Sequence, residues 1–336
     1  MHDALQELAH LVRSYRVVRS LDLLIMSGGG QLCELWGGPW SHPYNVFKFC
    51  TLAKLARTPV FIVGVGAGPL QHPLSKFFAR WSVRLANYTS FRDIESQALL
   101  RRIGAKAKTH VYPDPAYALD LRDYLIATRS ERSRLKVGLN PIGFCDPRLW
   151  PRKDDATYCR YLDKLANFSS WLLAQGYDLE VFTGEIGVDR FAIEDLSRRV
   201  LVSAIASGLP RIVCRAVPSV KELLVQMSDL DFVITSKFHG VIFSHLLTKP
   251  VIALSYHPKI DDLMRAVGHD QYCLDIEGFE VRSLVERFTS LVRESDDLSS
   301  RFRKKAVAYK DAVQLQFEEI LSKTGRKHVA GLGSFS

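Results

Sequence analysis

The chain is 336 residues long, more than one hydrophobic core usually serves, so the length predicts two domains. Hydrophobic residues make up 47% and charged residues 24% of the sequence, a globular balance that excludes an intrinsically disordered chain. The formal net charge is +9, but no nucleic-acid recognition motif accompanies it, which excludes nucleic acid as a partner. A solvated surface accounts for this charge first, and attraction to an anionic substrate or an anionic membrane surface accounts for it second.

Targeting and redox features predict a cytoplasmic protein. No apolar run approaches the roughly 18–20 residues of a membrane-spanning helix. Residues 1–7 begin an amphipathic helix and have neither the basic nor the apolar region of a signal peptide. The six cysteines form no close pair and have no histidine at zinc-ligand spacing, so we expect buried or free thiols and no metal site. We also expect no cofactor.

Short apolar segments alternate with amphipathic ones in the first third of the chain. Buried strands are predicted at residues 21–26, 59–63 and 88–91, and helices at residues 44–57, 73–87 and 94–103. Near-continuous apolar strands that are separated by helices indicate a parallel sheet with both faces covered.

The alternation stops in a polar, arginine-rich stretch at residues 119–135 and then begins again. The second series comprises predicted strands at residues 135–140, 179–183, 211–214, 231–235 and 251–254, which are separated by predicted helices at 157–175, 190–206, 218–227 and 240–247. Helical segments at 281–293 and 299–322 follow it. The expected fold class is therefore α/β, with two doubly wound, Rossmann-like domains that face a cleft. We expect an N-terminal domain at residues 1–130, a C-terminal domain at 131–295, a terminal helix at 296–325 that packs back on the N-terminal domain, and a flexible tail at 326–336.

Ligands of open α/β sheets bind beyond the carboxyl ends of the strands, so the strand-end loops are the candidate sites. Gly29 and Gly30 follow the first strand, where glycine lets the backbone approach a ligand. Gly66 and Gly68 follow the second strand, and their loop either presents backbone N–H groups to an anion or forms a plain tight turn. Arg92 follows the third strand and either binds an anion or pairs with acidic neighbours at the surface.

The loop after the strand at residues 231–235 carries the most chemically active side chains. It reads Ser236, Lys237, Phe238, His239 and Gly240. A cation and a histidine at a helix N-terminus are suited to bind an anion and to donate a proton, because histidine titrates near neutral pH. A histidine in this place also serves as a helix cap or a packing residue, and both interpretations stay open.

The order of these loops resembles the polysaccharide pyruvyl transferase family. The resemblance rests on residues 28–30, 64–69, 90–93, the Tyr-Pro-Asp-Pro-Ala run at 112–116, residues 236–240 and residues 255–259, and it covers most of the chain from residue 21 to about 274. Two features differ from the family. Lys237 stands where arginine is usual, and nothing before residue 21 matches the usual first strand and its Gly-Asn-x-Gly-Asp-like loop, so the N-terminal domain is expected to lack its first strand.

The resemblance implies a glycosyltransferase-B-like architecture and a specific reaction. The enzyme would move an enolpyruvyl group from phosphoenolpyruvate to a sugar of a cell-surface polysaccharide or its precursor, forming a pyruvate ketal. The acceptor would be a sugar or a lipid-linked glycan, which is consistent with a location in the cytoplasm at the inner face of the membrane. A nucleotide-sugar glycosyltransferase of the same fold and a shortened, non-catalytic glycan-binding relative are the alternatives.

The same resemblance implies roles for individual residues. His239 would protonate the enol carbon, and Asp114 would orient the acceptor or take its proton, although Asp114 also fits a turn between two prolines. Arg92 and Lys237 would anchor the phosphate and the carboxylate of the donor. The other expected substrate contacts are Gly29, Gly30, Gly66, Gly68, Ser236, Phe238 and Lys259.

Overall fold

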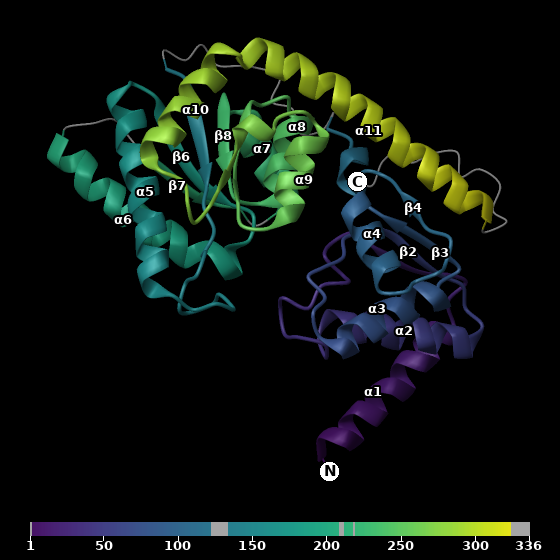
Figure 1. The fold of residues 1–336 in the computed structure, drawn as a ribbon. Coiled ribbons are helices and arrows are strands. Elements are labelled where there is room, and N and C mark those ends of the chain that lie inside the picture. Colours follow the sequence, from purple (N-terminus) through teal and green to yellow (C-terminus); the bar gives the residue numbers. More distant parts are fainter. Residues whose placement is uncertain (1, 122–133, 208–211, 218, 324–336) are drawn as a thin grey trace. The chain divides into compact units, whose positions relative to one another are not determined.

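The structure, a computed structural model, describes residues 2–121, 134–207, 212–217 and 219–323 (Figure 1). The chain forms two compact units, each of which is described by itself below. Unit 1 combines Met1–Ala118 with Tyr309–Ser336, and unit 2 comprises Leu119–Ala308. The expected domain boundary at residues 130–131 and the expected tail at 326–336 lie outside the described residues.

Unit 1 is built on a parallel sheet of four strands in the order β1-β2-β3-β4. Its elements are α1 (His2–Arg19), β1 (Leu24–Ser27), α2 (His42–Ala56), β2 (Val60–Val65), α3 (Pro73–Leu85), β3 (Tyr88–Phe91), α4 (Ile94–Arg102), β4 (His110–Val111), the 3-10 helix η1 (Pro115–Ala118) and the C-terminal part of α11 (Ser295–Lys323). Each strand is joined to the next through a helix, which is the connection that parallel strands require.

The core of unit 1 lies on both faces of β2, because successive side chains of a strand point to opposite faces. Val60 and Ile62 pack in the larger core with residues of α2, α3 and α4. Phe61 and Val63 face the other way and pack with Ile320 of α11. Burial of a side chain of this size stabilises the fold by roughly 1.5–3 kcal/mol. The wholly apolar sequence of this strand is therefore explained by covers on both sides of the sheet.

Unit 2 contains a parallel sheet of six strands in the order β10-β9-β8-β5-β6-β7. Its elements are β5 (Lys136–Asn140), α5 (Asp155–Ala174), β6 (Asp178–Thr183), α6 (Ile186–Ser207), β7 (Ile212–Ala216), α7 (Val220–Ser228), β8 (Phe232–Thr235), α8 (Phe238–Leu246), β9 (Val251–Ser255), α9 (Pro258–Ala266), the 3-10 helix η2 (Asp270–Tyr272), β10 (Cys273–Asp275), α10 (Val281–Arg293) and the first part of α11. The sheet grows outward in two directions from its first strand, β5, and β8 is the strand at which the direction changes. This order is that of a doubly wound Rossmann sheet.

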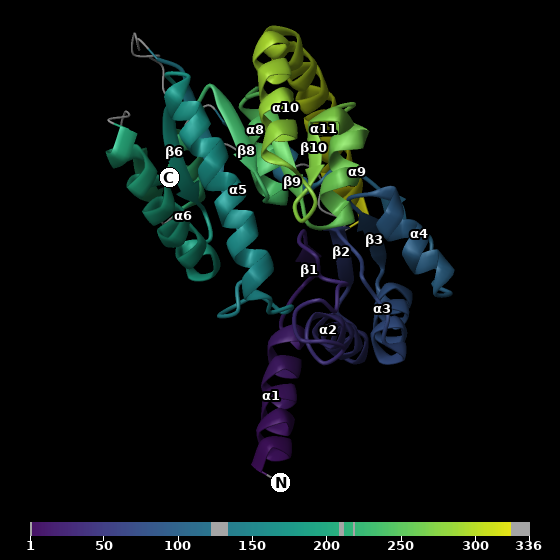
Figure 2. The same ribbon diagram turned by 60° about the vertical axis from the view of Figure 1, so that its left-hand side comes forward.

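Helices cover both faces of the second sheet. On one face α5 packs against α6 and α10, and Figure 2 shows α5 and α6 side by side. On the other face α8 packs against α7 and α9. Phe288 of α10 is fully buried, and its ring contacts Phe168 of α5 and Phe232 of β8. The α/β fold with two Rossmann-like domains, which the alternation of elements predicts, is confirmed.

Two details differ from the sequence-based expectation. The helix expected to begin at Gly240 begins at Phe238, so Phe238 and His239 lie in the first helical turn. The short strands β4 and β10 were not predicted, because two or three residues are too few for a recognisable apolar pattern. The first of them matters for the site, since it leads to Asp114.

Candidate active site

The switch point of the second sheet lies between β5 and β8, and ligands of doubly wound sheets bind beyond the strand ends at this position. The ends of three strands are tied together there by Asn140. Its Oδ1 accepts the hydroxyl of Thr235 at 2.8 Å, and its Nδ2 donates to the backbone oxygen of Phe182 at 2.8 Å. All three side chains are buried. These hydrogen bonds hold the ends of β5, β6 and β8 together, and these strand ends form the platform under the candidate site.

The segment at residues 236–240 follows directly from this platform. The backbone N–H of Lys237 donates to Thr235 Oγ1 at 3.0 Å, and Lys237 is the N-cap of α8. A Cβ atom on Gly240 would lie 2.3 Å from the same Thr235 oxygen, so only glycine lets the helix begin so close to the strand end. Ser236 is buried, with its hydroxyl 3.3 Å from that of Tyr161.

The ammonium group of Lys237 is held between two carboxylates. Its Nζ lies 2.5 Å from Glu185 Oε2 and 2.7 Å from Asp189 Oδ2. Asp189 is fully buried, and the same oxygen also accepts the hydroxyl of Thr183 at 3.0 Å. Burial lowers the pKa of Lys237, but the attraction of Asp189 and then of Glu185 outweighs burial, so its pKa is raised. This lysine is therefore a firmly charged residue whose charge is already balanced inside the protein.

The two acids beside Lys237 differ in their surroundings. Burial raises the pKa of the Asp189 carboxyl, in spite of the attraction of Lys237. Glu185 is 57% exposed, so an anion from solvent can compete with it for the lysine far more easily than with Asp189. Sequence reasoning missed both acids. The available signal was their position, since Glu185 follows the strand-end residue Thr183 by only two positions.

Three other expected residues lie around the first turns of α8 and α9. His239 is exposed, and its ring is 5.6 Å from that of Phe238 and 6.1 Å from that of Phe243. Lys259 Nζ lies 6.0 Å from the ring centre of Phe238 and 5.5 Å from that of Tyr256. Phe238 thus adjoins both His239 and Lys259. The N-terminal ends of two helices add partial positive charge to the same region, which suits an anion.

The two glycine-containing loops of unit 1 are hydrogen-bonded to each other. The N–H of Gly66 donates to the backbone oxygen of Gly29 at 2.8 Å, and the N–H of Gly68 donates to that of Leu32 at 2.7 Å. Gly30 lies in the first of these loops, after β1. The amide groups of Gly66 and Gly68 therefore have partners within the protein, and of the two interpretations of their loop this geometry favours the tight turn.

Arg92 and Asp114, both expected site residues, form a buried ion pair at the strand ends of unit 1. Arg92 Nη1 lies 3.1 Å from Asp114 Oδ2, and the two side chains are only 4% and 5% exposed. Asp114 Oδ1 also accepts the N–H of Ala116 at 3.0 Å. A Cβ atom on Gly66 would lie 2.8 Å from the Arg92 guanidinium, so the glycine makes room for it. The pair joins the ends of β2, β3 and β4.

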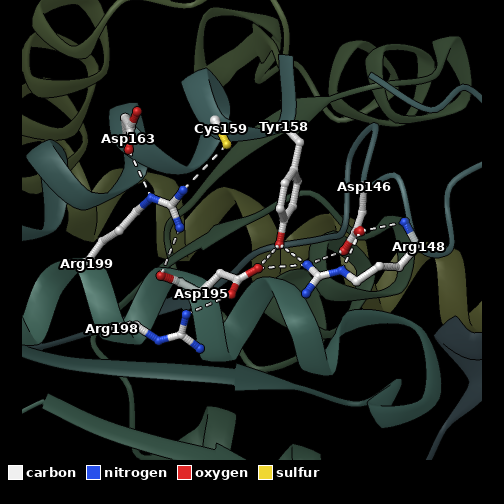
Figure 3. Close-up of polar contacts among 8 residues, drawn as sticks. All are labelled: Asp146, Arg148, Tyr158, Cys159, Asp163, Asp195, Arg198 and Arg199. Carbon is white, nitrogen blue, oxygen red and sulfur yellow. Dashed lines mark hydrogen bonds and ion pairs between the residues drawn. The ribbon is translucent and has the colours of Figure 1, made fainter. Parts of the chain in front are cut away.

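A second cluster of charged residues in unit 2, which sequence reasoning did not select, is a structural network (Figure 3). Arg148 contacts Asp146 at 2.7 Å, Asp195 at 2.7 Å and the hydroxyl of Tyr158 at 2.9 Å. Arg199 links Asp163 of α5 to the backbone of Asp195 in α6. A cavity of about 350 Å³ adjoins the cluster. Figure 3 draws three arginines and three aspartates, so the charges balance and the cluster ties α5 to α6.

Another cavity, of about 760 Å³, lies at the opposite edge of the sheet of unit 1. Leu23, Pro59 and Asn87, which precede β1, β2 and β3, line it together with Ile320 of α11. Its walls are mainly apolar and stand at the amino ends of the strands, away from the Arg92–Asp114 pair. Over the described ranges, no helix is long and apolar enough to cross a membrane, and no group of three His, Cys, Asp or Glu residues is arranged to hold a metal ion.

A sequence model of the family described as Polysaccharide pyruvyl transferase matches residues 5–258, about three quarters of the chain. The chain belongs to the polysaccharide pyruvyl transferase family. The family assignment based on the order of the loops is thus confirmed, and it implies a pyruvyl donor and a sugar or glycan acceptor. The matched region contains Arg92, Asp114 and the whole segment at 236–240.

Several solved structures with a similar fold are UDP-GlcNAc 2-epimerases. A UDP-GlcNAc 2-epimerase from Neisseria meningitidis, bound to UDP-GlcNAc, is 12% identical with a TM-score of 0.61, and the match covers 95% of this chain and 82% of that chain. A putative UDP-N-acetylglucosamine 2-epimerase from Listeria monocytogenes is 10% identical with a TM-score of 0.65, covering 95% and 80%. The enzyme from Methanocaldococcus jannaschii is 10% identical with a TM-score of 0.55, covering 83% and 73%. At such low identity these structures are similar in fold alone.

Proposed function

We propose that this protein transfers an enolpyruvyl group from phosphoenolpyruvate to a sugar of a cell-surface polysaccharide or its precursor, forming a pyruvate ketal. The observation that carries the proposal is the family match over residues 5–258, which includes the Ser-Lys-Phe-His-Gly segment at the switch point of unit 2. A doubly wound sheet binds its ligand at this position. The chemistry of the residues there suits a small molecule with two anionic groups.

The reaction balances without a redox partner. A proton adds to the methylene carbon of phosphoenolpyruvate, and one sugar hydroxyl attacks the neighbouring carbon, which has become electron-deficient. A second hydroxyl of the sugar then displaces phosphate, so two new carbon–oxygen bonds form and one breaks. The two hydroxyl protons account for the new methyl hydrogen and for the proton on the released phosphate. The protein must supply an acid for the first step and cationic or N–H groups for the two anions.

We assign donor binding to unit 2 and acceptor binding to unit 1. In unit 2, Lys259 and the first turn of α8 offer positive charge beside Phe238, and His239 is the proton donor. An anionic group of the donor would take the place of the exposed Glu185 on Lys237, while Asp189 keeps its contact. In unit 1, Arg92 holds Asp114 in a fixed position near the loop of Gly29 and Gly30, where it would orient the acceptor.

The first test is phosphate release from phosphoenolpyruvate in the presence of glycan acceptors, together with mass spectrometry of the acceptor. His239→Asn should retain the fold and donor binding but lower turnover by about 10²–10⁴-fold, the usual contribution of a general acid. His42→Asn, which alters another exposed histidine at a helix start, is the matched control and should have normal turnover. Normal turnover of a folded His239→Asn variant would remove this residue from the mechanism.

Thermal shift separates the proposal from its alternatives, because a specific ligand stabilises the fold by mass action. Stabilisation by phosphoenolpyruvate supports a pyruvyl transferase. Stabilisation by UDP-sugars alone would indicate a nucleotide-sugar enzyme. Stabilisation by free glycans alone, with no turnover of any donor, would indicate a non-catalytic relative. Glu185→Gln provides a further check, since removing the competing carboxylate should strengthen phosphoenolpyruvate binding by roughly 1 kcal/mol if the donor contacts Lys237.

We place the reaction in the cytoplasm, at the inner face of the membrane, with a lipid-linked glycan as the acceptor. The five described cysteines that are free thiols fit a reducing compartment. Fractionation of cells that produce the native protein, with the acceptor pool extracted from the membrane fraction, tests this placement. Ketal formation on water-soluble glycans only would contradict the lipid-linked acceptor.

A further inference from the structure

A long segment of unit 1 contains no acidic residue. Between Glu34 and Asp93 the sequence has neither aspartate nor glutamate, although the whole chain contains 36 of them among 336 residues. The basic residues in this segment are Lys48, Lys54, Arg57, Lys76, Arg80, Arg84 and Arg92. This segment forms α2 and α3, among other elements. Positive charge is therefore concentrated on these helices, and the segment itself has no acidic residue to balance it.

The outward face of α3 gathers three of these charges. At 3.6 residues per turn, positions 76, 77, 80 and 84 of a helix share one face. Lys76, Phe77, Arg80 and Arg84 are all exposed, while Phe78 and the other core-facing residues are buried. Neither α2 nor α3 contains an acidic residue. The stripe on α3 is therefore a basic surface with a large aromatic ring in its middle.

Exposed aromatic and aliphatic side chains adjoin this stripe. Trp40, in the loop between β1 and α2, is 63% exposed, and Phe77 and Leu74 are 40% and 38% exposed. The Trp40 ring packs edge-on against Phe78 of α3 at 5.6 Å, which places it at the side of that helix. Phe77 in turn packs against Phe78 at 5.8 Å. The exposed rings thus belong to one continuous cluster.

The aromatic cluster also meets the charges directly. The Arg84 guanidinium lies 4.8 Å from the ring centre of Trp81, and Trp81 is 6.0 Å from Phe77. Three of the five tryptophans of the chain, Trp36, Trp40 and Trp81, fall within the acid-free segment. A contiguous exposed apolar patch that is rimmed by polar side chains is typical of a surface that binds a protein, a membrane or another ligand.

We propose that the α3 surface, formed by Trp40, Leu74, Lys76, Phe77, Arg80 and Arg84, docks on an anionic phospholipid bilayer. Trp40, Leu74 and Phe77 enter the interfacial region, and the three basic side chains contact lipid phosphates. Interfacial amphipathic helices bind membranes in the same way, with aromatic rings at the level of the lipid headgroups. Each basic residue near an anionic membrane surface contributes about 1 kcal/mol to binding. The exposed leucine favours hydrocarbon over the stacked bases of a nucleic acid.

Docking would bring the enzyme to a lipid-linked acceptor in the membrane, and this benefit rests on the proposed function. A surface-bound enzyme meets such an acceptor by diffusion in two dimensions. The docking surface is inferred from the charge and the exposure of its side chains, which do not depend on the reaction. Binding to vesicles can therefore be measured whether or not the protein transfers pyruvyl groups.

Vesicle flotation of the full chain tests the proposal. The protein should float with vesicles of phosphatidylcholine and phosphatidylglycerol, remain unbound with phosphatidylcholine alone, and dissociate as salt screens the charges. Arg80→Glu combined with Arg84→Glu should lower partitioning at least about tenfold, and Trp40→Ala should lower it several-fold. Arg282→Glu combined with Arg287→Glu, two exposed residues of α10 in unit 2, changes the net charge equally and should bind like the wild type. Leu315→Ala, at a 62% exposed leucine of α11, is the control for the apolar contact.

Several results would overturn the proposal. These are equal binding to both vesicle types, equal loss in the α10 control, or unaltered binding of the Arg80→Glu, Arg84→Glu variant. Binding of single-stranded nucleic acid or of soluble glycan in place of vesicles would also overturn it. Far-ultraviolet circular dichroism and the unfolding midpoint establish that each variant is folded, and Arg80→Gln with Arg84→Gln is a milder second variant. Transfer to a water-soluble acceptor without vesicles should be unchanged in these variants, so loss of docking and failure of the enzymatic function are distinguishable.

Discussion

The strand-end sites of the two units each place a cation beside carboxylates, but the carboxylates differ in how far they are exposed to solvent. In unit 1, Arg92 lies 3.1 Å from Asp114 and 3.9 Å from Asp93, and the side chains of Arg92 and Asp114 are almost completely buried while that of Asp93 is 24% exposed. In unit 2, Lys237 faces two acids, one fully buried and one more than half exposed. The first arrangement is mostly shielded from solvent, because the cation and its nearer acid are both almost completely buried. The second can exchange its exposed partner for a ligand without uncovering the buried acid.

This difference separates structural from functional cations among residues that look alike in the sequence. Arg92 and Lys237 both follow a buried strand and both precede a helix. Their burial and partners differ because β4 brings Asp114 next to Arg92, whereas the start of α6 brings Glu185 and Asp189 next to Lys237. We expect Arg92 to act mainly on the stability of unit 1 and Lys237 to act mainly on binding.

The largest expected effect comes from breaking the buried pair. Arg92→Ala leaves the Asp114 carboxylate buried without its cation, which typically costs 3–5 kcal/mol. Hydrogen exchange of β2 and β3 in unit 1 should show this loss, while β8 in unit 2 stays protected. Arg101→Ala, at an exposed arginine of α4, is the matched control and should change stability by less than about 0.5 kcal/mol. A folded Arg92→Ala variant with normal protection but weak donor binding would show that Arg92 is a ligand and not a structural clamp.

Acid should destabilise unit 2 through two buried histidines. Burial lowers the pKa of His245 to about 3, and burial followed by the charge of Arg301 lowers that of His269 to about 4. Both rings pack against Phe302 of α11, at 4.5 and 4.3 Å. The unfolded chain, with histidine pKa values near 6.5, binds protons first as the pH falls. The contribution of these two histidines to the free energy of unfolding is therefore constant above about pH 6.5, and stability declines below that pH.

The slope should be about 1.4 kcal/mol per pH unit for each histidine, ending near pH 4 for His269 and near pH 3 for His245. Urea unfolding of unit 2 between pH 8 and pH 4 measures it. His269→Leu removes one titrating group and should reduce the slope by about half. An unchanged slope in a folded His269→Leu variant would mean that other groups dominate the acid response.

The sequence was sufficient to predict the fold class and the family, because both depend on local patterns. Apolar strands such as β2 and glycine-bounded loops are visible residue by residue, and the Ser-Lys-Phe-His-Gly segment keeps its order along the chain. The partners of the site residues were harder to predict. Lys237 and Glu185 are 52 residues apart, and only the parallel pairing of the sheet brings the loops after β6 and β8 together at one edge.

Gly240, at the start of α8, also shows that local sequence patterns do not reveal contacts between distant atoms. Gly240 reads as a loop residue or as the first residue of a helix, because glycine has low helix propensity. Its place within the first turn follows from the close approach of Thr235, a contact that no local pattern records. The network of Arg148, Asp146 and Asp195 was missed for a related reason, since Asp195 of α6 lies 47 residues from Arg148, which precedes α5.

A smaller effect is expected from filling the space beside the two strand-end glycines. Gly240→Ala would place a Cβ 2.3 Å from Thr235 Oγ1 and 3.1 Å from Thr235 Cβ, and a short buried side chain cannot move away, so we expect a loss of about 1–3 kcal/mol. Gly66→Ala meets the end of the longer Arg92 side chain and should cost less. Gly187→Ala, where nothing lies within 4 Å, is the control. Thermal unfolding measures all three, and a reversed order would contradict the packing argument.

The smallest effect is expected for Lys237→Arg, which keeps the positive charge between Glu185 and Asp189 and adds a planar set of donors. Stability and phosphoenolpyruvate affinity should each change by less than about 1 kcal/mol. Lys237→Met, a side chain of similar length, is the informative contrast, because it leaves Asp189 buried without its cation. The pKa of Asp189 is already raised by burial, so its carboxyl takes up a proton in that variant. A group whose pKa is raised on folding stabilises at low pH and loses this contribution as the pH rises, so the deficit of Lys237→Met should grow as the pH rises above about 4, the ordinary pKa of aspartate. A deficit that does not depend on pH, or a Lys237→Arg variant that no longer binds the donor, would contradict the view that this lysine serves as an exchangeable charge.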